Sequence, residues 1–297
     1  MAKITTAKSY NLGILFAILS SLGFGIMPFL VKDAMKEGLC TFSILFYRFA
    51  LASIALFIVI KIKGLSLRIN KRQLIEAILL AGLGCLITSF FLFLSYNYIS
   101  AGLATSLHFT YGAFVCIIMA IFFREQLNII KAISIFLSLI GVFLLIRGEQ
   151  LKIDLYGSFL ALITGLTYAI YLVGLNKCSI NKKPTLVLIF YVVTFSTILM
   201  IPTGISTHQF QWIQNTKELY DLVSLALIST IFSLILILEA IKRIGATKAA
   251  ILSTMEPISC LIFGLLFYHE VITLSIALGC SLIVLSVILI SKNSRLH

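Results

Sequence analysis

Charged side chains are scarce in this chain of 297 residues, because Asp, Glu, Lys and Arg together make up only 11% of it. Soluble domains contain roughly 25% charged and roughly 45–50% apolar residues. Here 60% of the residues are hydrophobic and the mean hydropathy is +1.11. A soluble fold of this size has too little interior to bury so much apolar surface. The composition therefore excludes a soluble enzyme, a disordered chain and a secreted disulfide scaffold.

Sequence motifs for metal binding, hydrolysis and nucleotide binding are also missing. The six cysteines show neither CxxC pairs nor the spacing of metal ligands, so we expect no metal site and no cofactor. Without a Walker A sequence, ATP is not the direct energy source. Without HExxH or GxSxG, an intramembrane enzyme remains only an alternative.

Ten apolar runs lie between charged or turn-forming residues. A helix of about 20 residues spans a hydrocarbon core about 30 Å thick. The runs cover residues 12–31, 42–60, 74–96, 101–123, 129–146, 155–175, 186–205, 219–240, 246–268 and 272–290. The first run is too long for the apolar region of a signal peptide and lacks a clear cleavage site, so we expect it to span the membrane. The sequence predicts an all-α polytopic membrane protein with ten transmembrane helices.

Basic residues predict the orientation of these helices. Of the 23 Lys and Arg, 17 fall in the segments that share a side with the N-terminus, 5 fall in the opposite segments, and Arg48 lies inside a run. Because basic loops stay in the cytoplasm, both termini are predicted to be cytoplasmic. The net charge of +12 therefore indicates orientation, and no nucleic-acid partner is expected.

A shift of 145 residues aligns residues 99–144 with residues 244–289 without a gap. A shift of 144 residues extends the match to the first and sixth runs. The informative pairs are Glu125 with Glu270, Gly13 with Gly157 and Ala17 with Ala161. We therefore predict two five-helix repeats, residues 1–148 and 149–297. Because each repeat has an odd number of spans, the two must be inverted, as in secondary transporters that bind substrate where the halves meet.

Glu256 lies about ten residues into the ninth run, close to the middle of the membrane. A carboxylate is unfavourable there, so we expect it to face a cavity or a partner, to carry a proton, or both. It is a candidate proton carrier or cation site. Pro257 removes a backbone N–H and frees a carbonyl near Ser253, which could line the same cavity. The alternative is that Glu256 only hydrogen-bonds a kinked neighbouring helix.

The fourth run carries a polar stripe at the matching position. Tyr111 falls opposite Glu256 in the 145-residue register, and helical spacing places Thr105 and His108 on the same face as Tyr111. His108 could titrate near neutral pH or donate a hydrogen bond to a substrate. The alternative is a histidine with a purely structural partner.

Two further features are candidates for substrate contact. Arg48, inside the second run, could bind a substrate anion, pair with a glutamate, or reach outward to the lipid headgroups. On the sixth run, Tyr168 and Tyr171 follow Thr164 at helical spacing and form an aromatic wall suited to a medium-sized organic substrate. The alternative for this wall is packing against a neighbouring helix.

A set of short motifs occurs in both halves of the chain. In the first half these are Gly23, Gly25, Lys32, Arg48, Tyr98-Ile99-Ser100-Ala101 and Glu125; in the second half they are Ile244-Gly245-Ala246, Glu256-Pro257 and His269-Glu270. Together they resemble the EamA-type family of the drug/metabolite transporter superfamily. The resemblance implies ten helices around a central cavity, alternating access, and export of small metabolites such as amino acids, nucleosides or drugs. The chain departs from the family pattern at Phe109-Thr110-Tyr111-Gly112, where the fourth helix often has a proline.

We therefore expect a secondary transporter of small organic metabolites in a bacterial cytoplasmic membrane. It would act as an exporter or exchanger by alternating access, with proton coupling as a hypothesis and a channel as an alternative. Its partners would be a small-molecule substrate and the lipid bilayer, and it would be a monomer or a homodimer.

Overall fold

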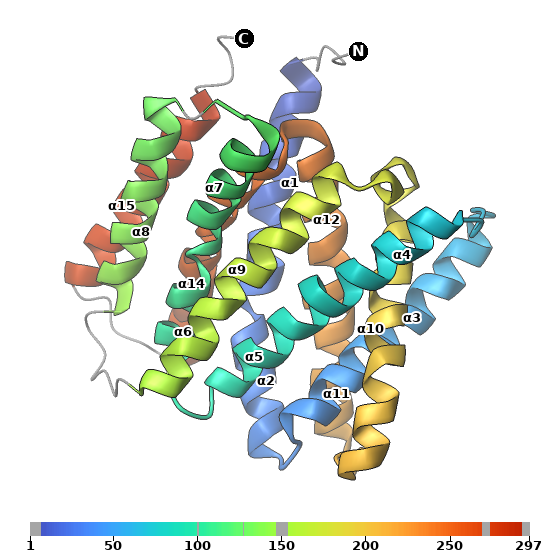
Figure 1. Ribbon diagram of the computed structural model, residues 1–297. Coiled ribbons are helices and arrows are strands. Elements are labelled where there is room, and N and C mark those ends of the chain that lie inside the picture. The colour runs from blue at the N-terminus through green and yellow to red at the C-terminus, as the bar shows by residue number, and fades with distance from the viewer. Residues whose placement is uncertain (1–6, 100, 127, 147–153, 269–273, 293–297) are drawn as a thin grey trace.

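A computed structural model describes residues 7–99, 101–126, 128–146, 154–268 and 274–292 of the protein. Over these residues the chain forms helices and no strand (Figure 1). The first half contains α1 (Ala7–Gly25), α2 (Met27–Lys36), α3 (Thr41–Ile62), α4 (Lys71–Leu79), the π-helical segment η1 (Leu80–Leu86), α5 (Ile87–Ser95), α6 (Ala101–His108), α7 (Tyr111–Phe123) and α8 (Ile129–Ile146). The second half contains α9 (Leu155–Lys177), the 3₁₀ helix η2 (Ser179–Lys182), α10 (Thr185–Thr207), α11 (Thr216–Ser224), the π-helical segment η3 (Leu225–Phe232), α12 (Ser233–Ile244), α13 (Ala246–Leu252), the 3₁₀ helix η4 (Ser253–Met255), α14 (Glu256–Tyr268) and α15 (Leu274–Lys292).

Six helices in the described part of the chain are long and apolar enough to cross a membrane. They are Lys8–Lys36, Thr41–Ile62, Lys71–Ser95, Leu155–Lys177, Thr185–Thr207 and Thr216–Ile244. Three shorter helices are also apolar: Tyr111–Phe123, Ile129–Leu144 and Ala277–Ile290. Helices suit this role because they satisfy every backbone polar group internally. The all-helical prediction is confirmed at this level.

Irregular helical segments recur at a fixed spacing. The π-helical segments η1 and η3 begin at Leu80 and Leu225, which are 145 residues apart. Likewise α7 begins at Tyr111 and α14 begins at Glu256, again 145 residues apart. The same local departures from regular α-helix therefore occur at matching places in the two halves.

The fourth apolar run is interrupted although it has no proline. Helix α6 ends at His108 and α7 begins at Tyr111. At the break, the Thr110 hydroxyl donates to the carbonyl of Leu107 at 2.7 Å. A side-chain hydroxyl can satisfy backbone acceptors at a break in a transmembrane helix. The interruption therefore does not depend on the proline that the family pattern often has here.

The helices pack in matching pairs. Helices α8 and α15 form one pair, and α3 and α10 form another on the opposite side of the molecule (Figure 1). Between these pairs, α1 packs on α12 and α14, whereas α9 packs on α5 and α7. In the 144–145 register α1 corresponds to α9, so the packing of α1 on α12 and α14 corresponds to the packing of α9 on α5 and α7.

Two glycines allow close approaches between the halves at matching positions. A Cβ atom on Gly13 of α1 would lie 2.7 Å from the Ile244 side chain and 3.0 Å from that of Arg243. One on Gly157 of α9 would lie 2.6 Å from the Tyr98 side chain and 3.1 Å from that of Ile99. Such distances are shorter than carbon–carbon contact, so a larger residue would force the helices apart. The two glycines are 144 residues apart, and their contacts at Tyr98-Ile99 and Arg243-Ile244 are 145 residues apart.

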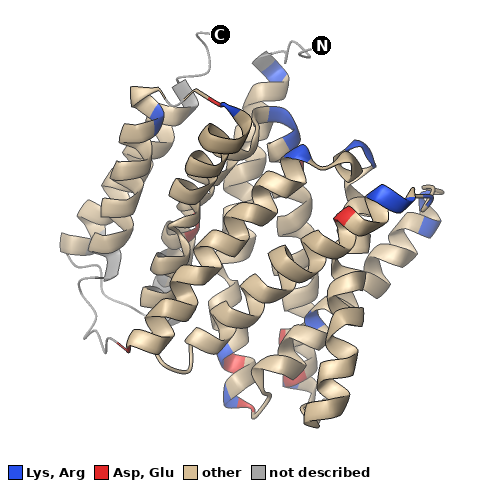
Figure 2. Cartoon of the chain, viewed as in Figure 1, with Lys and Arg blue, Asp and Glu red and all other residues tan. Residues whose placement is uncertain are grey.

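The two ends of the molecule differ in charge. Lys and Arg gather at the end that carries both termini, which we call the terminal end, whereas few basic residues lie at the opposite end (Figure 2). At the opposite end, Lys217 pairs with Glu37, and Lys36 pairs with Asp33 at 2.9 Å.

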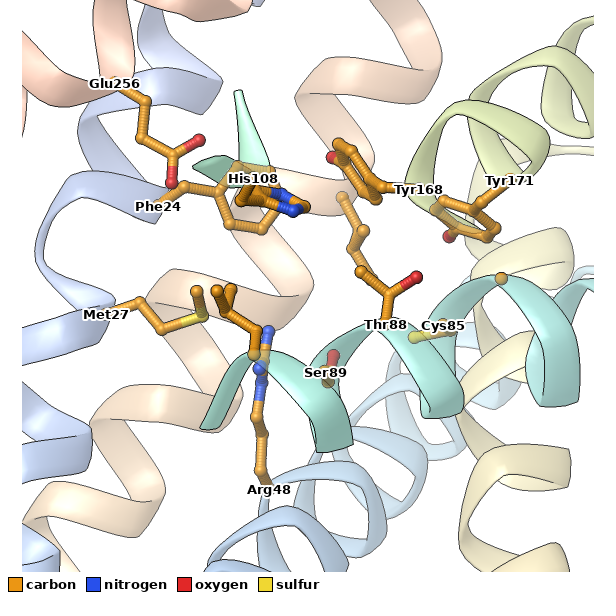
Figure 3. Close-up of a pocket in the computed structure, with 13 residues that line it drawn as sticks. Phe24, Met27, Arg48, Cys85, Thr88, Ser89, His108, Tyr168, Tyr171 and Glu256 are labelled. Atoms are coloured by element: carbon orange, nitrogen blue, oxygen red, sulfur yellow. The ribbon is translucent and has the colours of Figure 1, made fainter. Parts of the chain in front are cut away.

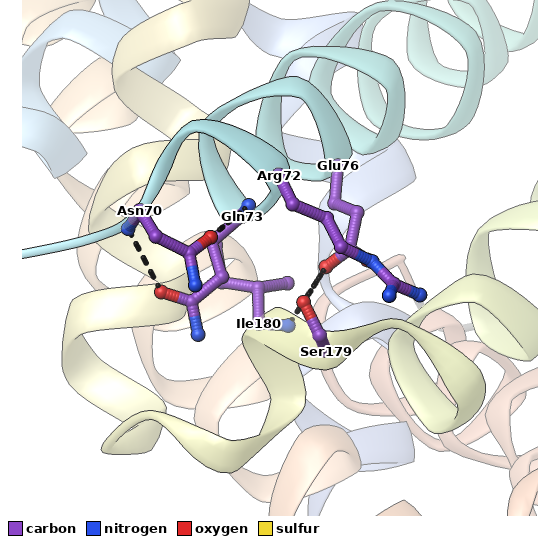
Figure 4. Close-up of polar contacts among 6 residues, drawn as sticks. All are labelled: Asn70, Arg72, Gln73, Glu76, Ser179 and Ile180. Carbon is purple, nitrogen blue, oxygen red and sulfur yellow. Dashed lines mark hydrogen bonds and ion pairs between the residues drawn. The ribbon is translucent and has the colours of Figure 1, made fainter.

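The terminal end holds α4 firmly against η2. Asn70 and Gln73 form a capping box at the start of α4, with bonds of 2.8 and 3.1 Å (Figure 4). One turn later, the Glu76 carboxylate accepts hydrogen bonds from Ser179 Oγ at 2.7 Å and from the backbone N–H of Ile180 at 2.9 Å. These bonds fix the third apolar run to the connection between α9 and α10.

Candidate functional site

A cavity lies in the middle of the molecule, between the two halves (Figure 3). The centres of water-sized molecules have about 50 Å³ available in it. Five residues singled out from the sequence line this cavity: Arg48 from α3, His108 from α6, Tyr168 and Tyr171 from α9, and Glu256 from α14. Folding thus brings together side chains from four different helices.

The remaining four candidates lie around the cavity rather than on its wall. Tyr111 is fully buried behind it, with its ring centroid 5.2 Å from that of His108 and 4.9 Å from that of Tyr168. Thr105 and Ser253 are buried, and Pro257 is half-buried in the first turn of α14. None of these four is among the lining residues.

Arg48 points from α3 into the cavity, and only 4% of its surface is exposed. Its Nε donates to the hydroxyl of Thr230, on η3, at 2.6 Å. The rings of Phe49 and Phe93 lie 5.5 and 5.6 Å from the guanidinium carbon, within the range of cation–π attraction. Its Nη1 is buried and has no hydrogen-bond partner among the described residues. The guanidinium therefore does not extend to the lipid headgroups and keeps a donor free.

Glu256 begins α14, where the 3₁₀ helix η4 ends, and 7% of its surface is exposed. Within the described ranges, its carboxylate has neither an ion pair nor a side-chain hydrogen bond. The carboxylate faces the same cavity as the Arg48 guanidinium (Figure 3). The cavity thus contains one group of each charge, each with bonding capacity left over.

The carbonyl freed one turn before Pro257 has a different role from the one expected. The oxygen of Ser253 accepts the N–H of Glu256 within η4 and lies 3.4 Å from the hydroxyl of Ser21 on α1. Ser253 Oγ itself donates to the carbonyl of Ala249 at 2.9 Å. This carbonyl therefore joins α1 to the break before Glu256 and does not line the cavity.

His108 has a direct partner on α9. Its Nδ1 lies 2.9 Å from the hydroxyl oxygen of Thr164. The Tyr168 ring lies 5.1 Å from the His108 ring, and Tyr171 follows 5.9 Å beyond Tyr168. The aromatic stripe of the sixth run thus faces the cavity, and the stripe also orients the imidazole.

Three polar residues at the cavity are not among those singled out from the sequence. Thr88 and Ser89, at the start of α5, line the cavity, and Thr230 holds Arg48. Thr88 Oγ1 lies 2.6 Å from Thr167 Oγ1 of α9. Their signal was a hydroxyl inside an otherwise apolar run, but such residues are common in membrane helices. Only the fold distinguishes the ones that face a cavity.

Glu125 and Glu239, which lie outside the cavity, have structural partners. Glu125 pairs with Lys131 at 2.8 Å and accepts from Thr247 at 3.1 Å, and Glu239 pairs with Arg243. No group of three or more His, Cys, Asp or Glu in the described ranges is arranged to hold a metal. Glu270 and His269 lie outside the described residues.

A helical membrane fold with a buried, charged cavity between two matching halves defines a class of protein, the membrane transporters. The EamA-like transporter family model matches residues 11–147 and again residues 155–292. The chain therefore belongs to the EamA-like transporter family.

Similar proteins in other organisms carry transporter names. The chain is 26% identical to the uncharacterized transporter YoaV of Bacillus subtilis, over 84% of this chain and 88% of that protein. It is 27% identical to the uncharacterized transporter YcbK of the same organism, over 90% and 89% of the two chains. It is also 27% identical to the uncharacterized inner membrane transporter YicL of Salmonella typhimurium, over 76% of each chain. The family and these names indicate a membrane transporter and not an enzyme.

A protein of known crystal structure has a similar fold. The two chains superpose with a TM-score of 0.80 over 95% of this chain and 97% of the other, at 14% sequence identity. At this identity the likeness shows a common fold and nothing about substrate.

Proposed function

We propose that the protein is a secondary transporter that moves a small organic solute through the central cavity by alternating access. The observation that carries this proposal is the pair Arg48 and Glu256, which are buried in one cavity and, in the described part of the chain, form no ion pair with each other. A buried charge without a partner is unfavourable unless another group neutralises it. A bound solute supplies that group.

The proposed architecture has ten membrane crossings in two inverted repeats, residues 1–148 and 149–297. Three observations support it. The family model matches the chain twice, irregular helical segments recur 145 residues apart, and the α1 packings correspond to the α9 packings. Transporters with such repeats rock one unit against another around a fixed site.

The size of the cavity favours a carrier over a channel. A space of about 50 Å³ for water centres holds a few water molecules. Sites for organic ligands usually have about 300–1,000 Å³. The halves must therefore move apart on one side to admit a solute, which is the motion of a carrier.

The proposed location is a bacterial cytoplasmic membrane, with the terminal end in the cytoplasm. The concentration of Lys and Arg at that end supports this orientation. A cysteine placed at Gln209 should react with an impermeant reagent from outside, whereas one placed at Ile69 should react only after permeabilisation. The opposite pattern would refute the orientation.

Glu256 is the proposed proton carrier, because it is the carboxyl that faces the cavity without a partner. Protonation would remove the unfavourable charge when no cation is near. Export coupled to proton entry, or exchange of two solutes, would use the same cavity.

Two measurements test the proposed function. First, untargeted metabolite comparison of cells with and without the protein identifies the solute that changes most. Second, proteoliposomes loaded with that solute are assayed for counterflow, in which an outward gradient of unlabelled solute drives uptake of labelled solute. A carrier gives transient accumulation of label that saturates with concentration. Flux that rises linearly with concentration and shows no counterflow would indicate a channel instead.

A further inference from the structure

The hydroxyl of Thr164 determines which nitrogen of His108 carries the proton. Thr164 Oγ1 lies 2.5 Å from the carbonyl oxygen of Ala161 and 2.9 Å from His108 Nδ1. A threonine hydroxyl has one proton to donate and two lone pairs. Two oxygens 2.5 Å apart without a proton between them would repel, so the Thr164 proton points to Ala161. The hydroxyl must then accept its other bond from Nδ1–H.

The second nitrogen of the imidazole is consequently left as an acceptor. His108 lines the cavity, and its Nε2 makes no hydrogen bond in the described part of the chain. The rings of Tyr111 and Tyr168, with centroids 5.2 and 5.1 Å away, keep the imidazole in its orientation. A neutral imidazole with hydrogen on Nδ1 presents a lone pair at Nε2.

A second pair of hydroxyls lies at the cavity wall. Thr88 Oγ1 lies 2.6 Å from Thr167 Oγ1, and either hydroxyl can donate to the other. Because a hydroxyl oxygen has two lone pairs, the oxygen of Thr88, which lines the cavity, keeps acceptor capacity in both arrangements.

We propose that Thr164 is a positioning residue that sets substrate specificity by holding His108 as the neutral Nδ1–H tautomer. His108 Nε2 and Thr88 Oγ1 then form an acceptor pole, and the free Nη1 of Arg48 forms a donor pole below it (Figure 3). The matching solute carries one anionic group for Arg48 and at least one N–H or O–H donor for His108. This substrate class rests on the proposed transport function, whereas the tautomer does not.

The tautomer is tested by ¹⁵N NMR of the full chain labelled at histidine and reconstituted in bilayers. His108 is assigned as the signal lost in the His108→Asn variant. The expected spectrum at neutral pH shows hydrogen on Nδ1 and none on Nε2, in wild type and in Thr164→Ser. Thr164→Val removes the acceptor and should abolish this preference. A wild-type signal from Nε2–H or from a doubly protonated ring overturns the proposal, as does a Thr164→Val signal identical to wild type.

The substrate class is tested with four small probes of similar size, by titrating each and following the His108 ¹⁵N signal. Alanine and lactate have both an anionic group and a donor; propionate lacks the donor, and isopropylamine lacks the anion. We expect alanine and lactate to shift the Nε2 signal, with affinity about tenfold weaker in Thr164→Val and unchanged in Thr164→Ser. Equal shifts from all four probes, or none from alanine and lactate, overturn the substrate class.

These results separate the two proposals. The ¹⁵N spectrum of His108 can be measured whether or not the protein transports a solute. If the spectrum is as expected but no counterflow is seen, only the transport function is refuted. Counterflow by a protein whose His108 carries hydrogen on Nε2 would refute the role of Thr164 alone.

Discussion

The two halves of the chain share their backbone features but not their charges. Helix α3 begins at Thr41 and α10 at Thr185, 144 residues apart. In this register, Arg48 in α3 corresponds to Val192 in α10. In the 145-residue register, Glu256 corresponds to Tyr111, and both residues begin a helix after a break. Backbone features therefore recur at matching positions in the two halves, whereas each cavity charge occurs once.

This difference has an electrostatic reason. A strictly duplicated Arg48 would put two guanidinium groups in one small cavity, and a duplicated Glu256 would put two carboxylates there. Like charges at short distance in a poorly solvated site repel strongly. One cation from the first half and one anion from the second avoid this repulsion. They also place the two charges on different halves, so a solute with a charged group binds in one orientation. A bound solute that contacts both charges also links the two halves.

The largest effect is expected from removing the carboxylate of Glu256, which has no counterpart in the first half. Glu256→Gln keeps the shape and hydrogen bonding of the protonated acid but cannot titrate. A proton-coupled carrier should lose gradient-driven accumulation completely, yet keep solute exchange, because exchange needs only loaded states to interconvert. Accumulation and counterflow in proteoliposomes measure the two activities separately.

Tyr111→Phe is the matched control, because it alters the corresponding position in the first half without touching a charge. It should keep both activities within about twofold. Unchanged accumulation and pH dependence in Glu256→Gln would mean that Glu256 is structural and that coupling resides elsewhere.

A second effect concerns the break shared by the two halves. A Cβ atom on Gly165 of α9 would lie 2.4 Å from the Thr110 hydroxyl and 3.1 Å from the backbone oxygen of His108, at the α6–α7 break. Overpacking of this kind destabilises by about 1–3 kcal/mol. Gly165→Ala should therefore lower the melting temperature clearly in detergent. Gly112→Ala, in the same break with nothing within 4 Å of its Cβ, should not. Equal melting temperatures for the two variants would contradict the close approach of α9.

Much of the helical framework could be predicted from the sequence, because apolar composition alone marks helices that a membrane must accommodate. The apolar run at 42–60 became α3, and the run at 186–205 became α10, each with ends within a few residues. The π-helical segments η1 and η3 and the proline-free break at Phe109-Thr110 were not predictable. They depend on which side chain or helix satisfies the freed backbone groups, and this is a property of tertiary packing.

Within the candidate site, the sequence pointed most directly to residues whose transfer into a membrane is energetically unfavourable. Arg48 and Glu256 were singled out for that reason, and both line the cavity. Thr88, Ser89 and Thr230 were not, because hydroxyls can satisfy themselves on their own helix. The carbonyl of Ser253 was assigned to the cavity from helix geometry, but α1 supplies a partner, Ser21, that the sequence does not reveal.

The third effect concerns the charge that only the first half has. Arg48→Lys keeps the positive charge but loses the planar guanidinium that bonds Thr230 and lies between Phe49 and Phe93. We expect about a tenfold loss of apparent affinity for the transported solute, measured as the half-saturating concentration in counterflow. Lys32→Arg, a basic swap at the end of the first membrane helix, is the control and should change nothing. Wild-type affinity in Arg48→Lys would remove Arg48 from substrate binding.

The smallest effect is expected from a pair of carboxylates that the halves do share. Glu76 in α4 and Asp221 in α11 lie 145 residues apart, but their surroundings differ. Glu76 accepts from Ser179 and Ile180, whereas Asp221 Oδ2 has no hydrogen-bond partner in the described part of the chain. Asp221 lies near the like charges of Asp33 and Glu37 and near the opposite charge of Lys217. The corresponding carboxylates thus differ: Glu76 bonds a neighbouring segment, whereas Asp221 Oδ2 does not.

Glu76→Gln weakens the acceptor of both η2 bonds and removes the ion pair with Arg72. That ion pair contributes little, because the Arg72 side chain is 80% exposed. The expected loss is therefore about 1 kcal/mol, from the hydrogen bonds. Asp221→Asn removes a charge that two carboxylates repel and one lysine attracts, and it should leave stability unchanged or raise it slightly. Thermal unfolding of both variants, combined with solvent accessibility of a cysteine placed at Lys182, measures the difference. If Asp221→Asn destabilised as much as Glu76→Gln, the difference inferred between these two carboxylates would be wrong.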